Sequence, residues 1–170
     1  MIRTGVKCVL AAAAASAFVL TSVLPASADT ITGTTTCTNP FTGATAGPTS
    51  FDVGIPATAT IGETVPVTVT FSFTNNSGFD LTDANTGTQA IATTGTSQNP
   101  ITVTTTGSTG PVANGATVTV SETGTWTPDQ AGTATFTLGN FSFNTIVFGF
   151  TVPVSCSFDA TPAAVSSVVS

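Results

Sequence analysis

The sequence lacks histidine and tyrosine altogether, and its only basic residues, Arg3 and Lys7, lie at the very start of the 170 residues. Proteins neutralise phosphate groups with Lys and Arg, so we expect no binding of nucleic acid. Beyond position 7 the chain also lacks the usual general bases, Schiff-base amines and Ser/His or Cys/His nucleophile pairs. These absences exclude most enzyme classes. We therefore predict a protein that is not an enzyme and needs no cofactor.

The first 28 residues have the pattern of an export signal. Two basic residues precede an apolar, alanine-rich run over residues 9–24, and the small residues Ala26-Ser27-Ala28 follow. We expect cleavage between Ala28 and Asp29, which leaves eight carboxylates and no cation. A retained anchor is the alternative, but the run is shorter than the roughly 20 apolar residues of a membrane span. The predicted divisions are a signal peptide (1–28), one domain (29–160) and a C-terminal tail (161–170).

Two cysteines remain after that cleavage, Cys37 near the start of the domain and Cys156 near its end. An even number of cysteines in an exported chain usually forms disulfides. The alternatives are metal binding by two lone thiols, or a reactive thiol with no base or cation nearby to lower its pKa. We predict a disulfide between Cys37 and Cys156.

Alternation of apolar residues with threonine predicts strands and almost no helix. The clearest case is the segment 65–74, in which Val and Phe alternate with Thr, Ser and Pro. A similar run from Ile146 to Val154 is long and apolar enough to predict one central strand. Turn-forming residues separate the runs, and the long central strand favours an all-β sandwich of seven to nine antiparallel strands over a closed barrel. Residues 161–170 are expected to form either an edge strand or a frayed tail.

Three segments carry a resemblance to a known family. They are Cys37-Thr38-Asn39-Pro40, the run from Ile55 to Glu63 and the run from Trp126 to Phe136. Together with the export signal and the final cysteine, they resemble secreted actinobacterial proteins whose domain is immunoglobulin-like and has no assigned function. The resemblance implies an immunoglobulin-like β-sandwich closed by one disulfide, Cys37–Cys156, and it carries over no catalytic residue.

Carboxylates offer two candidate sites. Asp80 with Asp83, or Glu63 with Glu122, are the pairs that glycoside hydrolysis would need, although the chain offers few aromatic residues for a sugar cleft. The oxygen-bearing side chains of Asp80, Asp83 and Asn85 before a glycine turn are a weak candidate for a cation such as Ca²⁺. An ordinary polar hairpin loop is the favoured interpretation.

Trp126 is a weak candidate for stacking on sugar rings, together with exposed phenylalanines such as Phe41 or Phe79. The alternative is that Trp126 fills the core beside Pro128. We predict a secreted, non-enzymatic structural or interaction module of the cell surface or the extracellular space, either retained at the wall or released. A carbohydrate-binding module is the second hypothesis. The expected partner is a surface protein or a polysaccharide, with no insertion into the membrane after signal cleavage.

Overall fold

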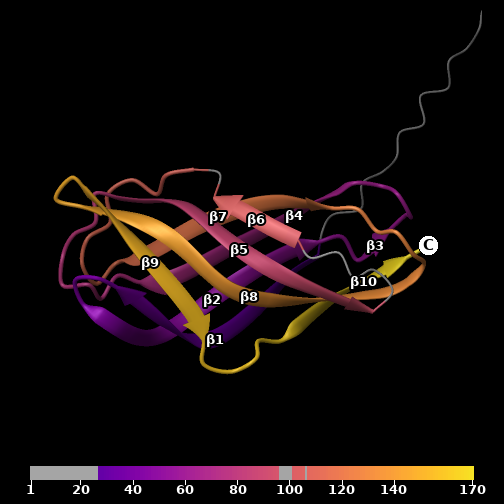
Figure 1. The fold of residues 1–170 in the computed structure, drawn as a ribbon, viewed down its shortest axis with the longest axis horizontal. Coiled ribbons are helices and arrows are strands. Elements are labelled where there is room, and N and C mark those ends of the chain that lie inside the picture. Colours follow the sequence, from indigo (N-terminus) through magenta and orange to yellow (C-terminus); the bar gives the residue numbers. More distant parts are fainter. Residues whose placement is uncertain (1–26, 96–100, 106) are drawn as a thin grey trace, which may run out of the picture.

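The computed structural model describes residues 27–95, 101–105 and 107–170, and these form ten strands and no helix (Figure 1). The predicted signal peptide lies outside the described residues, apart from its last two positions. In chain order the strands are β1 (Ser27–Asn39), β2 (Gly43–Ile55), β3 (Thr58–Ala59), β4 (Val65–Thr74), β5 (Asp83–Gly95), β6 (Ile101–Thr105), β7 (Thr117–Trp126), β8 (Gly132–Val147), β9 (Phe150–Phe158) and β10 (Ala164–Val169).

Eight antiparallel strands close into a barrel, so the predicted immunoglobulin-like sandwich is wrong. The order β8-β5-β6-β7-β4-β2-β1-β9 returns to its start because β9 also pairs with β8. β9 completes the ring through its pairing with β1 over Thr35–Thr38. Alternation along a strand is the same in a sandwich and in a barrel, and only the pairing of β9 on both of its edges distinguishes them.

The error has a local cause at residues 148 and 149. The sequence pattern predicted one strand from Ile146 to Val154, but the chain reverses at Phe148 and Gly149, which separate β8 from β9. Both residues have a positive φ, 53° for Phe148 and 82° for Gly149. Two consecutive positive φ values are typical of the type I′ turn that joins adjacent antiparallel strands. The long final strand is therefore a hairpin.

The C-terminal segment also belongs to the sheet. β10 pairs with the first part of β8 and, in parallel, with the two residues of β3, and both lie outside the eight-strand ring. Val165 and Val169 of β10 are buried. None of the described residues forms a helix that could cross a membrane.

Apolar side chains that alternate along the strands fill the barrel. In β4 the residues Val65, Val67, Val69 and Phe71 are buried, while the intervening residues are exposed or half-buried. Phe71 lies at the centre of an aromatic cluster, with its ring centroid 4.8 Å from that of Phe141. Phe51, Phe73 and Phe143 also contact this ring. An eight-stranded barrel is narrow enough for side chains to fill it, and the phenylalanines do so across its middle.

Cys37 and Cys156 form the predicted disulfide, with an S–S distance of 2.05 Å. They are directly opposite each other in the antiparallel pairing of β1 with β9. The bond therefore fixes the seam at which the barrel closes. It joins neighbouring strands of one sheet, whereas the sandwich prediction had only placed it between the first and last strands.

Candidate functional site: an apolar cavity at the barrel mouth

One end of the barrel is open and leads into a cavity of about 620 Å³. Three connections surround the opening: the β1–β2 turn at residues 40–42, the β4–β5 loop at residues 75–82 and the β8–β9 turn. The deeper wall is formed by residues of β1, β2, β4, β8 and β9, among them Cys37, Thr49, Phe73, Phe143 and Val154. This volume lies within the range of about 300–1,000 Å³ that is typical of small-molecule sites.

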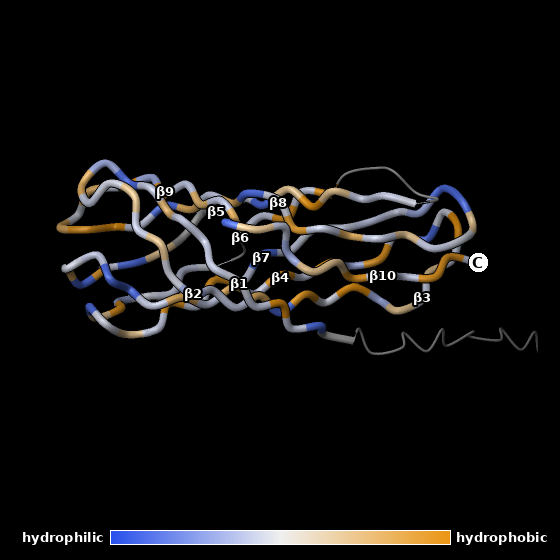
Figure 2. Tube along the Cα trace, turned by 90° about the horizontal axis from the view of Figure 1, so that it is seen from below, coloured by the Kyte–Doolittle hydropathy of each residue, from blue (hydrophilic) through white to orange (hydrophobic). Residues whose placement is uncertain are grey.

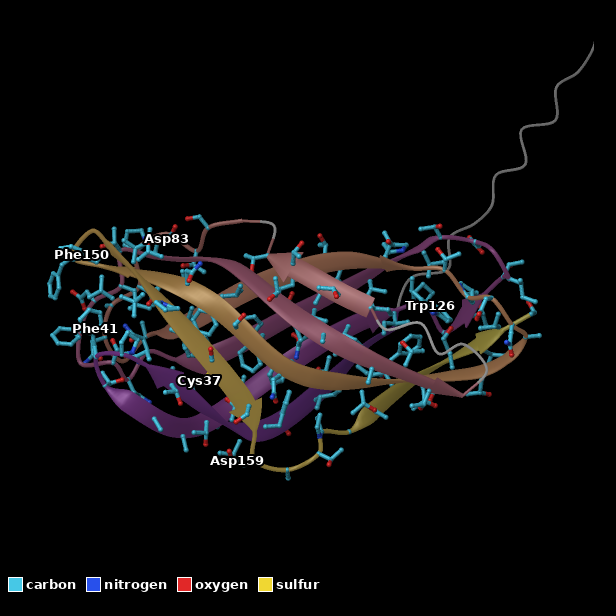
Figure 3. The ribbon with its side chains drawn as sticks, viewed as in Figure 1. Cys37, Phe41, Asp83, Trp126, Phe150 and Asp159 are labelled. Atoms are coloured by element: carbon cyan, nitrogen blue, oxygen red, sulfur yellow. A yellow bond between two sulfur atoms is a disulfide. The ribbon has the colours of Figure 1, made fainter. Side chains whose placement is uncertain are left out.

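Four exposed phenylalanines surround this opening, and we call them the phenylalanine rim. They are Phe41 (66% exposed), Phe79 (43%), Phe148 (74%) and Phe150 (69%). The rings of Phe79 and Phe148 meet edge to face, with centroids 5.6 Å apart. Figure 3 shows Phe41 and Phe150 together at one end of the barrel, and in Figure 2 the loops of that end, away from the C-terminus, include hydrophobic residues beside hydrophilic ones.

Phe148 combines exposure with an unfavourable backbone. A positive φ is rare for a bulky residue, and it costs on the order of 1–3 kcal/mol when the surrounding structure imposes it. Gly149 beside it adopts a positive φ without this penalty. An Asn-Gly pair is the favoured choice for such a turn. The phenylalanine at position 148 therefore stabilises neither the turn nor the core, which points to a role at the cavity.

The polar residues near the rim hold the loops in place. The Oδ1 atom of Asn39 accepts hydrogen bonds from the backbone N–H groups of Phe41 and Thr42, both at 2.9 Å. Asn75 is buried, and its side-chain amide donates to the carbonyl oxygens of Phe79 and Ala113, at 2.9 and 3.2 Å. Its Oδ1 atom accepts from Ser77. These two amides fix two loops of the mouth and have little capacity left for a ligand.

A pair of hydroxyl groups lies at the inner end of the cavity. Thr35 and Thr49 are buried, and their Oγ1 atoms are 2.7 Å apart. Thr35 precedes the last residue of β1 by four positions, so it lies roughly 13 Å from that end of the strand. The Sγ atom of Cys37, part of the disulfide, is 4.0 Å from the Thr35 hydroxyl.

No protein-family model and no curated protein matches this chain. The resemblance to secreted actinobacterial immunoglobulin-like proteins therefore stays a prediction, and the sandwich it implied is wrong. Any functional assignment rests on the geometry of the barrel.

Trp126 lies far from the mouth and inside the barrel. It is only 2% exposed and packs edge to face on Phe136, with ring centroids 4.9 Å apart. Figure 3 shows it at the end of the barrel opposite Phe41 and Phe150. A sugar ring outside the protein cannot stack on this indole. Among the described residues, the exposed aromatic rings are those of the phenylalanine rim, to which two of the predicted candidates, Phe41 and Phe79, belong.

The candidate cation ligands make separate loop contacts. Asp80 accepts a hydrogen bond from the backbone N–H of Asn114 at 2.8 Å. Asp83 accepts from the Ser108 hydroxyl at 2.6 Å and from the Gly110 N–H at 3.1 Å. The backbone of Asn85 belongs to β5, and its side chain is not among those described. Within the described residues no group of three or more His, Cys, Asp or Glu side chains could hold a metal ion.

Glu63 and Glu122 do not form a catalytic pair. Glu63 is exposed, and its carboxylate accepts from the N–H of Thr60 in the turn before β4. Glu122 lies in the middle of β7 opposite Val69 and is fully buried. Neither of its carboxylate oxygens has a hydrogen-bond partner among the described residues. Burial raises the pKa of Glu122 to about 7.

Sequence reasoning missed Phe148 and Phe150, which the alternation had assigned to a buried strand face. Gly149 between them was the available signal, because a glycine inside an apparent strand often marks a turn or a bulge. The cavity itself had no sequence signal. The cavity exists because the strands close into a barrel and the side chains between the phenylalanine cluster and the mouth do not fill its interior.

Proposed function

We propose that this protein is a non-enzymatic binding protein that holds an apolar small molecule in the mouth of its barrel. The observation that carries the proposal is the continuity between the cavity and the phenylalanine rim. A cavity with apolar walls gains free energy by removing apolar ligand surface from water, at roughly 25 cal/mol per Å². The rim extends this apolar surface to the outside, where a ligand first makes contact.

The proposal keeps the predicted interaction role and the predicted site of action outside the cell. The export signal supports extracellular action, and the disulfide suits an oxidising compartment. A polysaccharide is a less favoured ligand, because the lone tryptophan is buried. A second depression, over the outer face of β5, β8 and β9, is lined largely by Ser, Thr and Asn and has no exposed aromatic ring for stacking on a sugar.

Gly47 provides a direct test of the cavity. It lies in β2 on the cavity wall, opposite Thr35, and an added Cβ atom there would meet no atom within 4 Å. Gly47→Phe should therefore occupy the cavity without displacing its walls. Gly107→Phe is the matched control, because position 107 is equally open but does not line the cavity.

The measurement is a fluorescence titration with the neutral probe N-phenyl-1-naphthylamine. At the efficiency of drug-sized ligands, this probe of about 17 non-hydrogen atoms gains about 5 kcal/mol, which corresponds to a Kd of about 0.2 mM. We expect the wild type and Gly107→Phe to bind the probe in this range, and Gly47→Phe to bind at least tenfold more weakly. Equal binding by both variants, or no binding by the wild type, would overturn the proposal.

A further inference from the structure

We infer that the ligand of the mouth cavity is an uncharged amphiphile, such as a long-chain alcohol or ester, which enters with its polar end first, and that the site discriminates against fatty carboxylates. This inference rests on the proposed function and goes on to name the chemical class of the ligand. Three observations carry it. The cavity walls lack charged side chains, the Asn39 and Asn75 amides already donate hydrogen bonds within the protein, and the hydroxyl pair of Thr35 and Thr49 is buried at the inner end of the cavity.

The walls of the cavity carry no charged side chain. From position 8 to the end of the chain there is no Lys, Arg or His, and the same stretch holds eight carboxylates. A bound carboxylate would therefore find no side-chain cation among residues 27–170, and the net charge of this stretch would repel it. A binding site for fatty acids needs a positive charge or several hydrogen-bond donors to hold the carboxylate.

Two of the three asparagine amides at the mouth already donate to protein acceptors. The Asn39 amide donates to Thr42 in its own turn, and the Asn75 amide donates to the carbonyl oxygens of Phe79 in its loop and of Ala113 before β7. The third, Asn76, is exposed. The four exposed rings of the phenylalanine rim favour contact with the apolar end of a ligand.

The inner end of the cavity has one hydrogen-bond donor to offer. Two hydroxyls, those of Thr35 and Thr49, share one hydrogen bond, which uses one of their two hydrogens. Among the described residues, the only other hydrogen-bond contact of the pair is that of Thr35 with the Cys37 sulfur at 4.0 Å, a weak acceptor. The oxygen of an alcohol or an ester can accept the second hydrogen, so the pair suits a single neutral oxygen atom.

A fatty carboxylate has two orientations, and neither is favourable. With its head inward, the charge is buried beside two hydroxyls and no cation, so the cost of removing it from water is not offset. With its head outward, the charge stays at the exposed rim, where the net negative charge of the chain repels it, and the hydroxyl pair is left without a ligand partner. A neutral alcohol of the same length avoids both costs.

The test compares 1-dodecanol with dodecanoate at pH 8, each as a competitor that displaces N-phenyl-1-naphthylamine from the purified protein. We expect dodecanol to bind at least tenfold more tightly than dodecanoate. Replacing both Thr35 and Thr49 by Val removes the two hydroxyls together with little change of shape, and it should weaken dodecanol about fivefold, the value of one hydrogen bond. Thr32→Val is the matched control, because Thr32 is exposed on β1 and does not line the cavity, and its loss should leave the affinity unchanged.

The outcomes separate the two proposals. If dodecanoate competes as well as dodecanol, the inference about ligand class is overturned and the apolar binding function stands. If the double Thr35→Val, Thr49→Val variant binds dodecanol as tightly as Thr32→Val while both still bind the probe, the polar end does not lie at the hydroxyl pair, and the inward orientation is overturned. If the wild type does not bind the probe, both proposals fail.

Discussion

The buried carboxyl group of Glu122 should make the stability of this protein depend on pH in a direction that is uncommon for a carboxylate. Most carboxylates in folded proteins are paired or hydrogen-bonded, and their proteins lose stability in acid. Glu122 has the opposite environment. Val69 on β4 and Thr105 on β6 lie opposite it in the sheet, and a Cβ atom at Gly87 would approach its Oε1 atom to 2.8 Å. None of these three neighbours carries a charge.

The sign and the size of the effect follow from the raised pKa. Burial raises the pKa of Glu122 from 4.5 to about 7. Between these two values the folded state binds more protons than the unfolded state, so the free energy of unfolding falls as the pH rises. At 1.36 kcal/mol per pH unit, the loss amounts to about 3 kcal/mol and is complete above pH 7.

Glu122→Gln removes the titration and keeps the size of the side chain. A buried glutamine has its own cost, but that cost is the same at every pH and shifts the curve without changing its shape. We subtract the free energy of unfolding of the wild type from that of the variant. We expect this difference to be larger at pH 8 than at pH 4 by up to about 3 kcal/mol. The assay is urea denaturation at one-unit steps from pH 4 to pH 8, with the disulfide intact.

Glu63→Gln serves as the control, because Glu63 is exposed in the turn before β4. Titration of the remaining carboxylates contributes equally to the wild type and to Glu122→Gln, so it cancels in the difference between their curves. A difference that stays constant from pH 4 to pH 8 would refute the reasoning, and so would a difference that grows toward acid.

Two further predictions concern the mouth and the seam of the barrel. Phe148→Asn should raise the free energy of unfolding by about 1 kcal/mol, since asparagine tolerates a positive φ, and it should weaken binding of the naphthylamine probe. Urea denaturation measures the first effect and probe titration the second. A variant less stable than the wild type would contradict the proposed backbone strain at this turn. The double substitution Cys37→Ser with Cys156→Ser should lower the free energy of unfolding by about 2–5 kcal/mol and weaken probe binding, because the bond fixes a seam in the cavity wall. Urea denaturation tests this, and an intact mass that shows two free thiols in the untreated wild type would rule out the bond itself.

The local elements were largely predictable from the sequence. The strand expected at residues 65–74 coincides with β4, because strict alternation at this length has one straightforward interpretation. The same alternation runs along β7 from Val118 to Trp126 and includes Glu122. The pattern therefore already indicated that Glu122 and Trp126 are buried. Their burial also explains why neither is a catalytic or stacking group at the surface.

The closure of the sheet was not predictable in the same way. A strand with one apolar face fits a sandwich or a barrel equally well, and the distinction depends on which strands pair across a long stretch of sequence. The disulfide limited the choice, because it places β1 near β9. It did not show that the two strands pair directly, and β9 closes the ring only because it also pairs with β8.

Closure of the ring and formation of the mouth depend on the same two residues. The turn at Phe148 and Gly149 sends β9 back along β8 and onto β1, which completes the ring. It also places Phe148 at the tip and Phe150 at the start of the returning strand, where both belong to the rim. A turn with asparagine at position 148 would close the barrel with less strain, but it would remove the most exposed ring from the mouth. The turn therefore gives up backbone stability for an apolar entrance, and this is the physical reason to look for function at this end of the barrel.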